Sequence, residues 1–176
     1  MTQAVKDFVL DFQHLAASLT SRPTRLRELV PSHPAYVGAS DASAADMGGV
    51  WFPTNNQPPS SSGGLPSPWR WWLLPWSRMP TQMAPSQTVT LSSLPRTIAH
   101  QDILAQHHPV AELTTASGSD NTAAVAWQQN GSTTTAAARA YLLRLSALHQ
   151  RHHRYVQRIH YIPGPANVMA NDASRL

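Results

Sequence analysis

Three aspartates stand beside small or polar residues where a strand is expected to end or a terminal helix to begin. They are Asp41 in Ser-Asp-Ala-Ser, Asp120 in Ser-Asp-Asn-Thr and Asp172 in Asn-Asp-Ala-Ser. Carboxylates at strand ends can converge on one edge of a sheet and hold hard cations, and a pair of Mg²⁺ ions can assist in-line attack on a phosphodiester. An Asp followed by Ser or Thr is also typical of a turn or a helix N-cap, so the spacing alone leaves both interpretations open.

Hydrophobic periodicity and turn residues indicate the elements that would position these aspartates. Strands are expected over residues 36–41, 47–52, 69–76, 110–116 and 157–162. Helices are expected over residues 94–106, 121–129, 134–149 and 167–176. This order predicts an α/β domain in which helices pack on a central mixed sheet.

The ends of the chain and its proline content suggest how it is organised. Residues 1–34 are expected to form an N-terminal helical connector, and residues 35–176 a single domain. Within that domain, residues 53–68 are rich in Pro, Ser and Gly and are expected to form a loop. The crowded tryptophans that follow are expected to fill the core beside the sheet rather than to stack on nucleic-acid bases; they are Trp69, Trp71, Trp72 and Trp76.

Composition narrows the classes of protein to be considered. The 176 residues include 13 Lys and Arg against 9 Asp and Glu, which favours a polyanionic partner but also fits an ordinary Arg-rich surface. The absence of Cys excludes a disulfide scaffold, a Cys-ligated zinc site and a Cys nucleophile. No apolar run approaches the roughly 20 residues of a membrane helix, and no secretory signal is recognisable. We therefore expect an intracellular protein, in the cytoplasm or nucleus, with no membrane partner.

Four local sequence motifs occur in an order and at a spacing that resemble a known family. They are Asp41-Ala-Ser with Met47-Gly-Gly-Val-Trp51, Thr97-Ile-Ala-His-Gln-Asp102, Asp120-Asn-Thr-Ala-Ala-Val-Ala-Trp127, and Tyr161-Ile-Pro-Gly-Pro-Ala-Asn-Val-Met-Ala170 closing in Ala-Ser-Arg175. Together they resemble the ribonuclease H-like domain of eukaryotic LTR and DIRS-like retrotransposon polyproteins, over roughly residues 35–176. Residues 11–30 are similar to the connector that precedes this domain in such elements.

The resemblance implies a five-stranded mixed sheet flanked by helices and Mg²⁺-dependent endonucleolytic hydrolysis of RNA in RNA–DNA hybrids. It also implies a reverse transcriptase domain as partner in the ancestral polyprotein. The family places four carboxylates in the order Asp, Glu, Asp, Asp. Asp41 matches the first and Asp120 the third, so both are expected to bind metal, and Asn121 beside Asp120 is expected to contact nucleic acid.

The second and fourth carboxylates of the family are not matched. The second should lie near Ser93, yet no Asp or Glu occurs between Asp46 and Asp102. The fourth aligns with Asn171, and the acidic Asp172 follows one residue later, which is about 100° of rotation on a helix.

The predicted catalytic set is therefore Asp41, Asp120 and Asp172, with Asn171 and Ser93 as degenerate positions, and the predicted metal ligands are the three aspartates. We expect impaired catalysis, because hard-cation sites depend on the number of charged ligands. Two alternatives remain open: a non-catalytic nucleic-acid-binding module, and a non-functional retroelement remnant.

The most basic stretch of the chain is a candidate nucleic-acid interface, and a solvated helix face is the alternative. The arginines expected to contact nucleic acid there are Arg139, Arg144, Arg151 and Arg154. Two adjacent histidine pairs, His107–His108 and His152–His153, raise the question of a transition-metal site. Adjacent residues do not share a helix face, and no nearby carboxylate completes a ligand set in the sequence, so zinc is not expected.

Overall fold

The computed structural model describes residues 2–43, 46–54, 70–75, 89–131 and 137–175. Its strands are β1 (Pro34–Ala42), β2 (Asp46–Pro53), β3 (Arg70–Pro75), β4 (Thr114–Ser119) and β5 (Val156–Tyr161). Its α-helices are α1 (Gln3–Ser21), α2 (Val89–His107), α3 (Thr122–Asn130), α4 (Ala137–His153) and α5 (Val168–Ala173). Within the described ranges, short 3₁₀ helices also cover Leu26–Glu28 and Gly164–Ala166.

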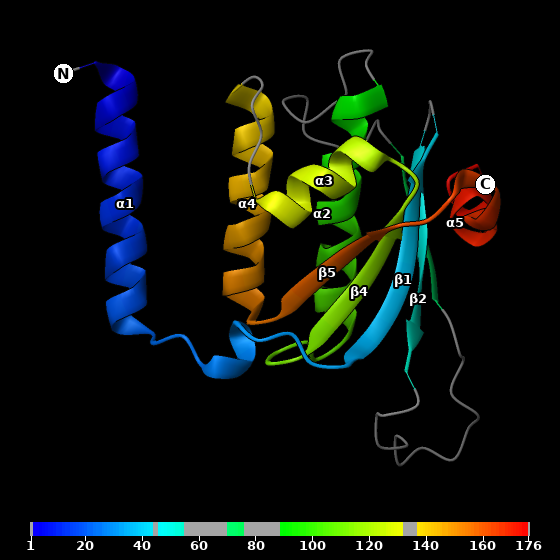
Figure 1. Cartoon of the computed structure of the whole chain (residues 1–176), viewed down its shortest axis with the longest axis horizontal. Coiled ribbons are helices and arrows are strands. Elements are labelled where there is room, and N and C mark those ends of the chain that lie inside the picture. The colour runs from blue at the N-terminus through cyan, green and yellow to red at the C-terminus, as the bar shows by residue number, and fades with distance from the viewer. Residues whose placement is uncertain (1, 44–45, 55–69, 76–88, 132–136, 176) are drawn as a thin grey trace.

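The strands form one mixed sheet in the order β3-β2-β1-β4-β5. Strands β1, β2 and β3 pair antiparallel, whereas β4 runs parallel to both β1 and β5. Helices α2, α3 and α4 lie on one side of this sheet and α5 lies on the other (Figure 1). The expected α/β architecture, with a five-stranded mixed sheet flanked by helices, is therefore confirmed.

Helix α1 stands apart from the sheet, beyond α4 (Figure 1). Most of its apolar side chains are exposed, including Val5, Phe12 and Leu19. Within the connector expected over residues 1–34, the chain after α1 forms only a short 3₁₀ turn at Leu26–Glu28 in addition to extended segments. The helical character of this arm was thus correctly expected, but the arm adds little to the apolar core.

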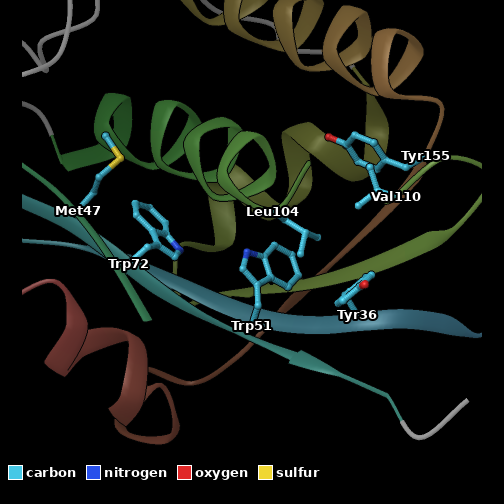
Figure 2. Packing of buried hydrophobic residues seen from close by; sticks show 7 residues of the cluster. All are labelled: Tyr36, Met47, Trp51, Trp72, Leu104, Val110 and Tyr155. Atoms are coloured by element: carbon cyan, nitrogen blue, oxygen red, sulfur yellow. The ribbon is translucent and has the colours of Figure 1, made fainter. Parts of the chain in front are cut away.

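The core lies between the sheet and α2, and it is rich in aromatic residues (Figure 2). Its buried members are Tyr36, Met47, Trp51, Trp72, Leu104, Val110 and Tyr155. The core role expected for Trp72 is confirmed; Trp69 and Trp76, and the side chain of Trp71, lie outside the described residues. Burying large aromatic rings contributes much of the hydrophobic stabilisation of a domain of this size.

Strand β4 differs from the strand expected over residues 110–116. It begins at Thr114 because Glu112 adopts a left-handed conformation, with φ of 63°, which turns the chain just before the strand. It then continues to Ser119, beyond the expected end at residue 116, and all its residues are buried. A central parallel strand is covered on both faces, so small and polar residues here mark close packing rather than a turn.

Helix α4 presents a different face to the core than its apolar residues suggested. Leu142 and Ser146 are buried, whereas the large apolar side chains of Tyr141 and Leu148 are exposed. Residues four apart share a helix face, so the inward face continues from Leu142 through Ser146 toward His149. Among the described residues, no helix is long and apolar enough to cross a bilayer.

His100 is a fully buried histidine of α2 that the fold keeps neutral. Its Nε2 donates to the carbonyl of Val50 (3.2 Å), and its Nδ1 accepts from the Ser117 hydroxyl (3.0 Å). The ring stacks on Trp51 with centroids 3.9 Å apart. Burial, opposed by the Val50 hydrogen bond and aided by the nearby charge of Arg96, lowers the pKa of His100 to about 3.

Stability should therefore depend on pH through His100. Below pH 6.5, its ordinary pKa, the unfolded chain binds a proton that the folded chain excludes, so this residue lowers stability as pH falls toward about 3. Each pH unit in that window costs about 1.4 kcal/mol. Between pH 6.5 and 4.5 the free energy of unfolding of the native chain should fall ~2 kcal/mol further than that of His100→Gln. Urea unfolding across this range measures the difference; parallel curves would contradict a neutral buried imidazole.

Gly48 allows α5 to lie directly on the sheet. A Cβ at Gly48 would lie 2.4 Å from the backbone carbon and oxygen of Ala173. The Gly48→Ala variant should therefore lose about 1–3 kcal/mol of stability, because backbone atoms cannot yield as a side chain does. A Cβ at Gly164 would meet its nearest atom at 3.8 Å, so Gly164→Ala is a matched control with a smaller loss. Equal urea midpoints for the two variants would exclude this role for Gly48.

Candidate functional site

Two of the predicted aspartates are brought together at the centre of the sheet. Strands β1 and β4 are parallel neighbours, with Ala39 opposite Gly118. Asp41 follows Ala39 by two residues and Asp120 follows Gly118 by two, so the two aspartates lie level at the ends of these strands. The expectation that strand-end carboxylates converge on one edge of the sheet therefore holds for this pair.

The guanidinium group of Arg96 lies between the two carboxylates. Its Nη1 donates to Asp41 Oδ1 at 3.1 Å, and its Nη2 is 3.4 Å from Asp120 Oδ1. Nη2 also donates to the hydroxyl of Ser119. The side chains of Arg96 and Asp41 are only 4% and 9% exposed, whereas that of Asp120 is 30% exposed. A cation supplied by the chain itself thus occupies the space between the two aspartates.

The second oxygen of Asp41 is also engaged. The Ser174 hydroxyl, at the end of α5, donates to Asp41 Oδ2 at 2.8 Å. Both carboxylate oxygens of this buried residue therefore have a donor from the protein. The network joins β1, β4, α2 and the C-terminal end of α5 at one point.

Arg96 carries its positive charge in a buried environment. Burial lowers the pKa of Arg96, while the negative charges of Asp120 and Asp41 raise it again. Because the pKa of arginine starts above about 12, the group remains protonated near neutral pH. The aspartates thus offset the desolvation of the guanidinium group, and its charge in turn compensates theirs.

The residues at this site do not fit a pair of Mg²⁺ ions. Such ions require several free carboxylate oxygens around an open position. Here Arg96 fills the position between Asp41 and Asp120, and Asp41 has no free oxygen.

The two degenerate positions and Asp172 lie around this network. Asn171 donates from Nδ2 to the carbonyl of Gly164 (3.2 Å), and Gly164 in turn lies beside Asp120. Asp172 is exposed on α5, and within the described part of the chain no hydrogen bond or ion pair joins its carboxylate to the other two aspartates. Ser93 lies in α2, one helical turn before Arg96, and its side chain is outside the described residues.

The sequence revealed neither the hydroxyls of Ser119 and Ser174 nor the central residue of the site, Arg96. It directly precedes the motif Thr97–Asp102, three residues after the position expected to carry the family's Glu. Residues three apart share a helix face, so an arginine at this spacing in a stretch without acidic residues was the available signal.

Three of the four arginines expected to contact nucleic acid, Arg144, Arg151 and Arg154, contact the N-terminal arm in this structure. Arg151 donates to the hydroxyls of Ser18 and Thr24 and to two backbone carbonyls of the arm. Arg154, which adopts a left-handed conformation, pairs with Glu28 at 2.7 Å and Glu112 at 3.0 Å.

The remaining residues of the expected interface are also placed by the structure, except for one side chain. Arg144 pairs with Asp11 of α1. Asn121 caps α3, its side-chain oxygen accepting from the Ala124 amide at 2.9 Å. The side chain of Arg139 lies outside the described residues. The arginines described here are therefore already paired within the chain.

Comparison with known proteins supports the fold. The chain is similar to the structure of LC11-RNase H1 in complex with an RNA/DNA hybrid, with a TM-score of 0.51 and 12% identity, over 78% of this chain and 92% of that one. The N-terminal RNase H domain of Rv2228c from Mycobacterium tuberculosis, solved as a fusion with maltose-binding protein, gives a TM-score of 0.48 and 13% identity. That match covers 80% of this chain and 93% of the other. No protein-family model and no curated protein matches the sequence. The likeness to LC11-RNase H1 shows the fold alone: this chain has an RNase H-like fold.

Removing the central cation should destabilise the domain strongly. The Arg96→Met variant leaves Asp41 buried without a counter-charge, for which a loss of about 3–5 kcal/mol is expected. The exposed Arg158→Met variant is the control and should change stability by less than about 0.5 kcal/mol. Urea unfolding measures both, and adding Asp41→Asn to Arg96→Met should recover part of the loss. A loss no larger than the control's would contradict the buried ion network.

Proposed function

We propose that this chain is the RNase H-like domain of a retrotransposon polyprotein, that it binds RNA–DNA hybrids, and that its Mg²⁺-dependent hydrolysis is impaired. The observation that carries the proposal is the position of Arg96 between Asp41 and Asp120. The retrotransposon origin is supported by the four sequence motifs, and residues 1–34 would then be the connector to the preceding polyprotein segment, where a reverse transcriptase domain is the expected partner.

Electrostatics support the loss of metal-dependent cleavage. Arg96 is held by two aspartates and by Ser119, so displacing it would separate a buried cation from its counter-charges. Removing one partner of a buried ion pair costs several kcal/mol. An incoming Mg²⁺ would have to meet that cost and would still face a site that lacks the family's second carboxylate. Arg96 thus competes directly with the metal for the same oxygens.

Binding to a hybrid does not require these carboxylates. The chain carries a formal net charge of +4, and phosphate contacts by basic residues dominate the affinity of proteins for nucleic acids. Because Arg151 and Arg154 hold the arm, other arginines must supply the phosphate contacts. Arg175 follows Ser174 at the edge of the site, and Arg158 lies on β5; both are exposed. We assign the contacts with the phosphate backbone of the hybrid to Arg158 and Arg175.

Assays of cleavage and of binding with a labelled RNA–DNA hybrid test the two parts of the proposal separately. The native chain should bind the hybrid in a salt-dependent manner and show no Mg²⁺-dependent cleavage above background. Arg158→Ala with Arg175→Ala should weaken binding and flatten its salt dependence by about two phosphate contacts. Hybrid binding unchanged by this pair would overturn the assignment, and no binding at all by a cooperatively melting chain would leave only the remnant interpretation.

Restoring the acidic positions tests the catalytic part. Arg96→Met with Ser93→Glu and Asn171→Asp should raise Mg²⁺-dependent cleavage at least ~10-fold over the native chain, because the competing cation is removed and the two missing carboxylates are supplied as metal ligands. Adding Asp120→Asn should abolish the gain. A thermal melt first establishes that each variant is folded. Strong cleavage by the native chain, lost in Asp120→Asn, would show that Arg96 does not block the site.

A further inference from the structure

A second group of titratable side chains lies between α2 and α4, away from the Arg96 network. Asp102 on α2 and the pair His149 and His153 on α4 each offer one ligand atom, and these atoms all lie within 4.8 Å of one another. Among the described residues, these are the three potential metal-ligating side chains that lie close enough together to bind one ion. The sequence predicted no carboxylate near these histidines. That prediction is wrong, because the packing of α2 against α4 brings Asp102 close to them.

The spacing on α4 explains why these two histidines act together. His149 and His153 are four residues apart, so they lie one above the other on the same helix face. Their ring centroids are 4.4 Å apart. The adjacent His152, which the sequence pairs with His153, is exposed.

The ligand atoms have a separation suited to a small divalent ion. His149 Nε2 lies 3.1 Å from Asp102 Oδ1. Two ligands bound tetrahedrally at the usual zinc distances of 2.0–2.1 Å are separated by about 3.3 Å. A small shift of the side chains would thus admit an ion between these two atoms, with His153 as the third ligand.

Further hydrogen bonds orient these ligands. The Tyr155 hydroxyl is 2.9 Å from His149 Nδ1, so the ring can donate its Nδ1 proton there when Nε2, which contacts Asp102 in this structure, binds an ion instead. Gln106 Nε2 donates to Asp102 Oδ2 at 2.6 Å, which leaves Oδ1 directed at His149. Outer partners of this kind, which fix the tautomer and direction of each ligand, are typical of metal sites in proteins.

We propose that Asp102, His149 and His153 form a binding site for one divalent transition-metal ion of the zinc type. Two imidazoles and a carboxylate suit Zn²⁺ rather than Mg²⁺, which prefers oxygen ligands alone. The Asp102 side chain is 43% exposed, so water has access to the fourth coordination position. The bound ion would link α2 to the end of α4, which carries Arg151 and is followed by Arg154.

Titration of the full chain with Zn²⁺ alone, followed by calorimetry, tests this site. The native chain should bind one ion tightly, and chelation with EDTA should lower its Tm. His153→Ala should weaken the affinity at least ~10-fold, whereas the matched control His152→Ala, which removes the exposed neighbour, should stay within about 2-fold. Tyr155→Phe, which removes only the orienting hydroxyl, should weaken binding ~10-fold.

Two results would overturn the proposal. One is equal Zn²⁺ affinity for His153→Ala and His152→Ala, which would assign binding to other histidines. The other is full affinity in Asp102→Asn, a variant of the same shape at a partly exposed position. Co²⁺ substitution gives an independent measurement, because a tetrahedral site produces visible absorption that should disappear with His153→Ala. None of these measurements depends on nucleic-acid binding, so they stand apart from the function proposed above.

Discussion

The buried ion network around Arg96 constrains most of this structure. A desolvated guanidinium group is tolerated only when counter-charges and hydrogen-bond acceptors surround it. Here those partners come from the ends of β1 and β4, so the parallel register must bring Asp41 and Asp120 level. Helix α2 must lie close enough to deliver the arginine. On the other face of the sheet, the end of α5 must lie close enough for Ser174 to reach Asp41.

The sequence predicted this site in part, and the reason lies in which relationships are local. Asp41 and Asp120 were identified because each ends a strand, and parallel pairing then places them together. The missing acidic residue was equally visible as a gap in composition. Arg96 was not predicted, because its reach from α2 to both strands depends on how the helix packs, which no local pattern records. The same holds for Asn171, whose amide binds Gly164 rather than a metal site.

Charge partners far apart in the chain account for a second difference. The arginines near the end of α4 look like a surface for phosphate when the sequence is read alone. Their acidic partner Glu28 lies 126 residues before Arg154, and Ser18 lies 133 residues before Arg151. The sequence also did not determine which face of α4 turns inward, because the adjacent residues Leu148 and His149 lie on different helix faces. Packing against α2 turned His149 inward, toward Asp102 and Tyr155, which gives α4 a polar contact in place of an apolar one.

The attachment of the arm has a consequence for how solvent conditions act on the molecule. Helix α1 keeps its apolar residues exposed and is held by hydrogen bonds and ion pairs such as Arg144 with Asp11, both about half exposed. Exposed ion pairs weaken as ionic strength rises, whereas apolar burial does not. The packing of the sheet on α2, which rests on an aromatic core, is therefore weakened chiefly by temperature and denaturant. The attachment of the arm is weakened chiefly by salt. Rising salt should thus release the arm under conditions in which the domain stays folded.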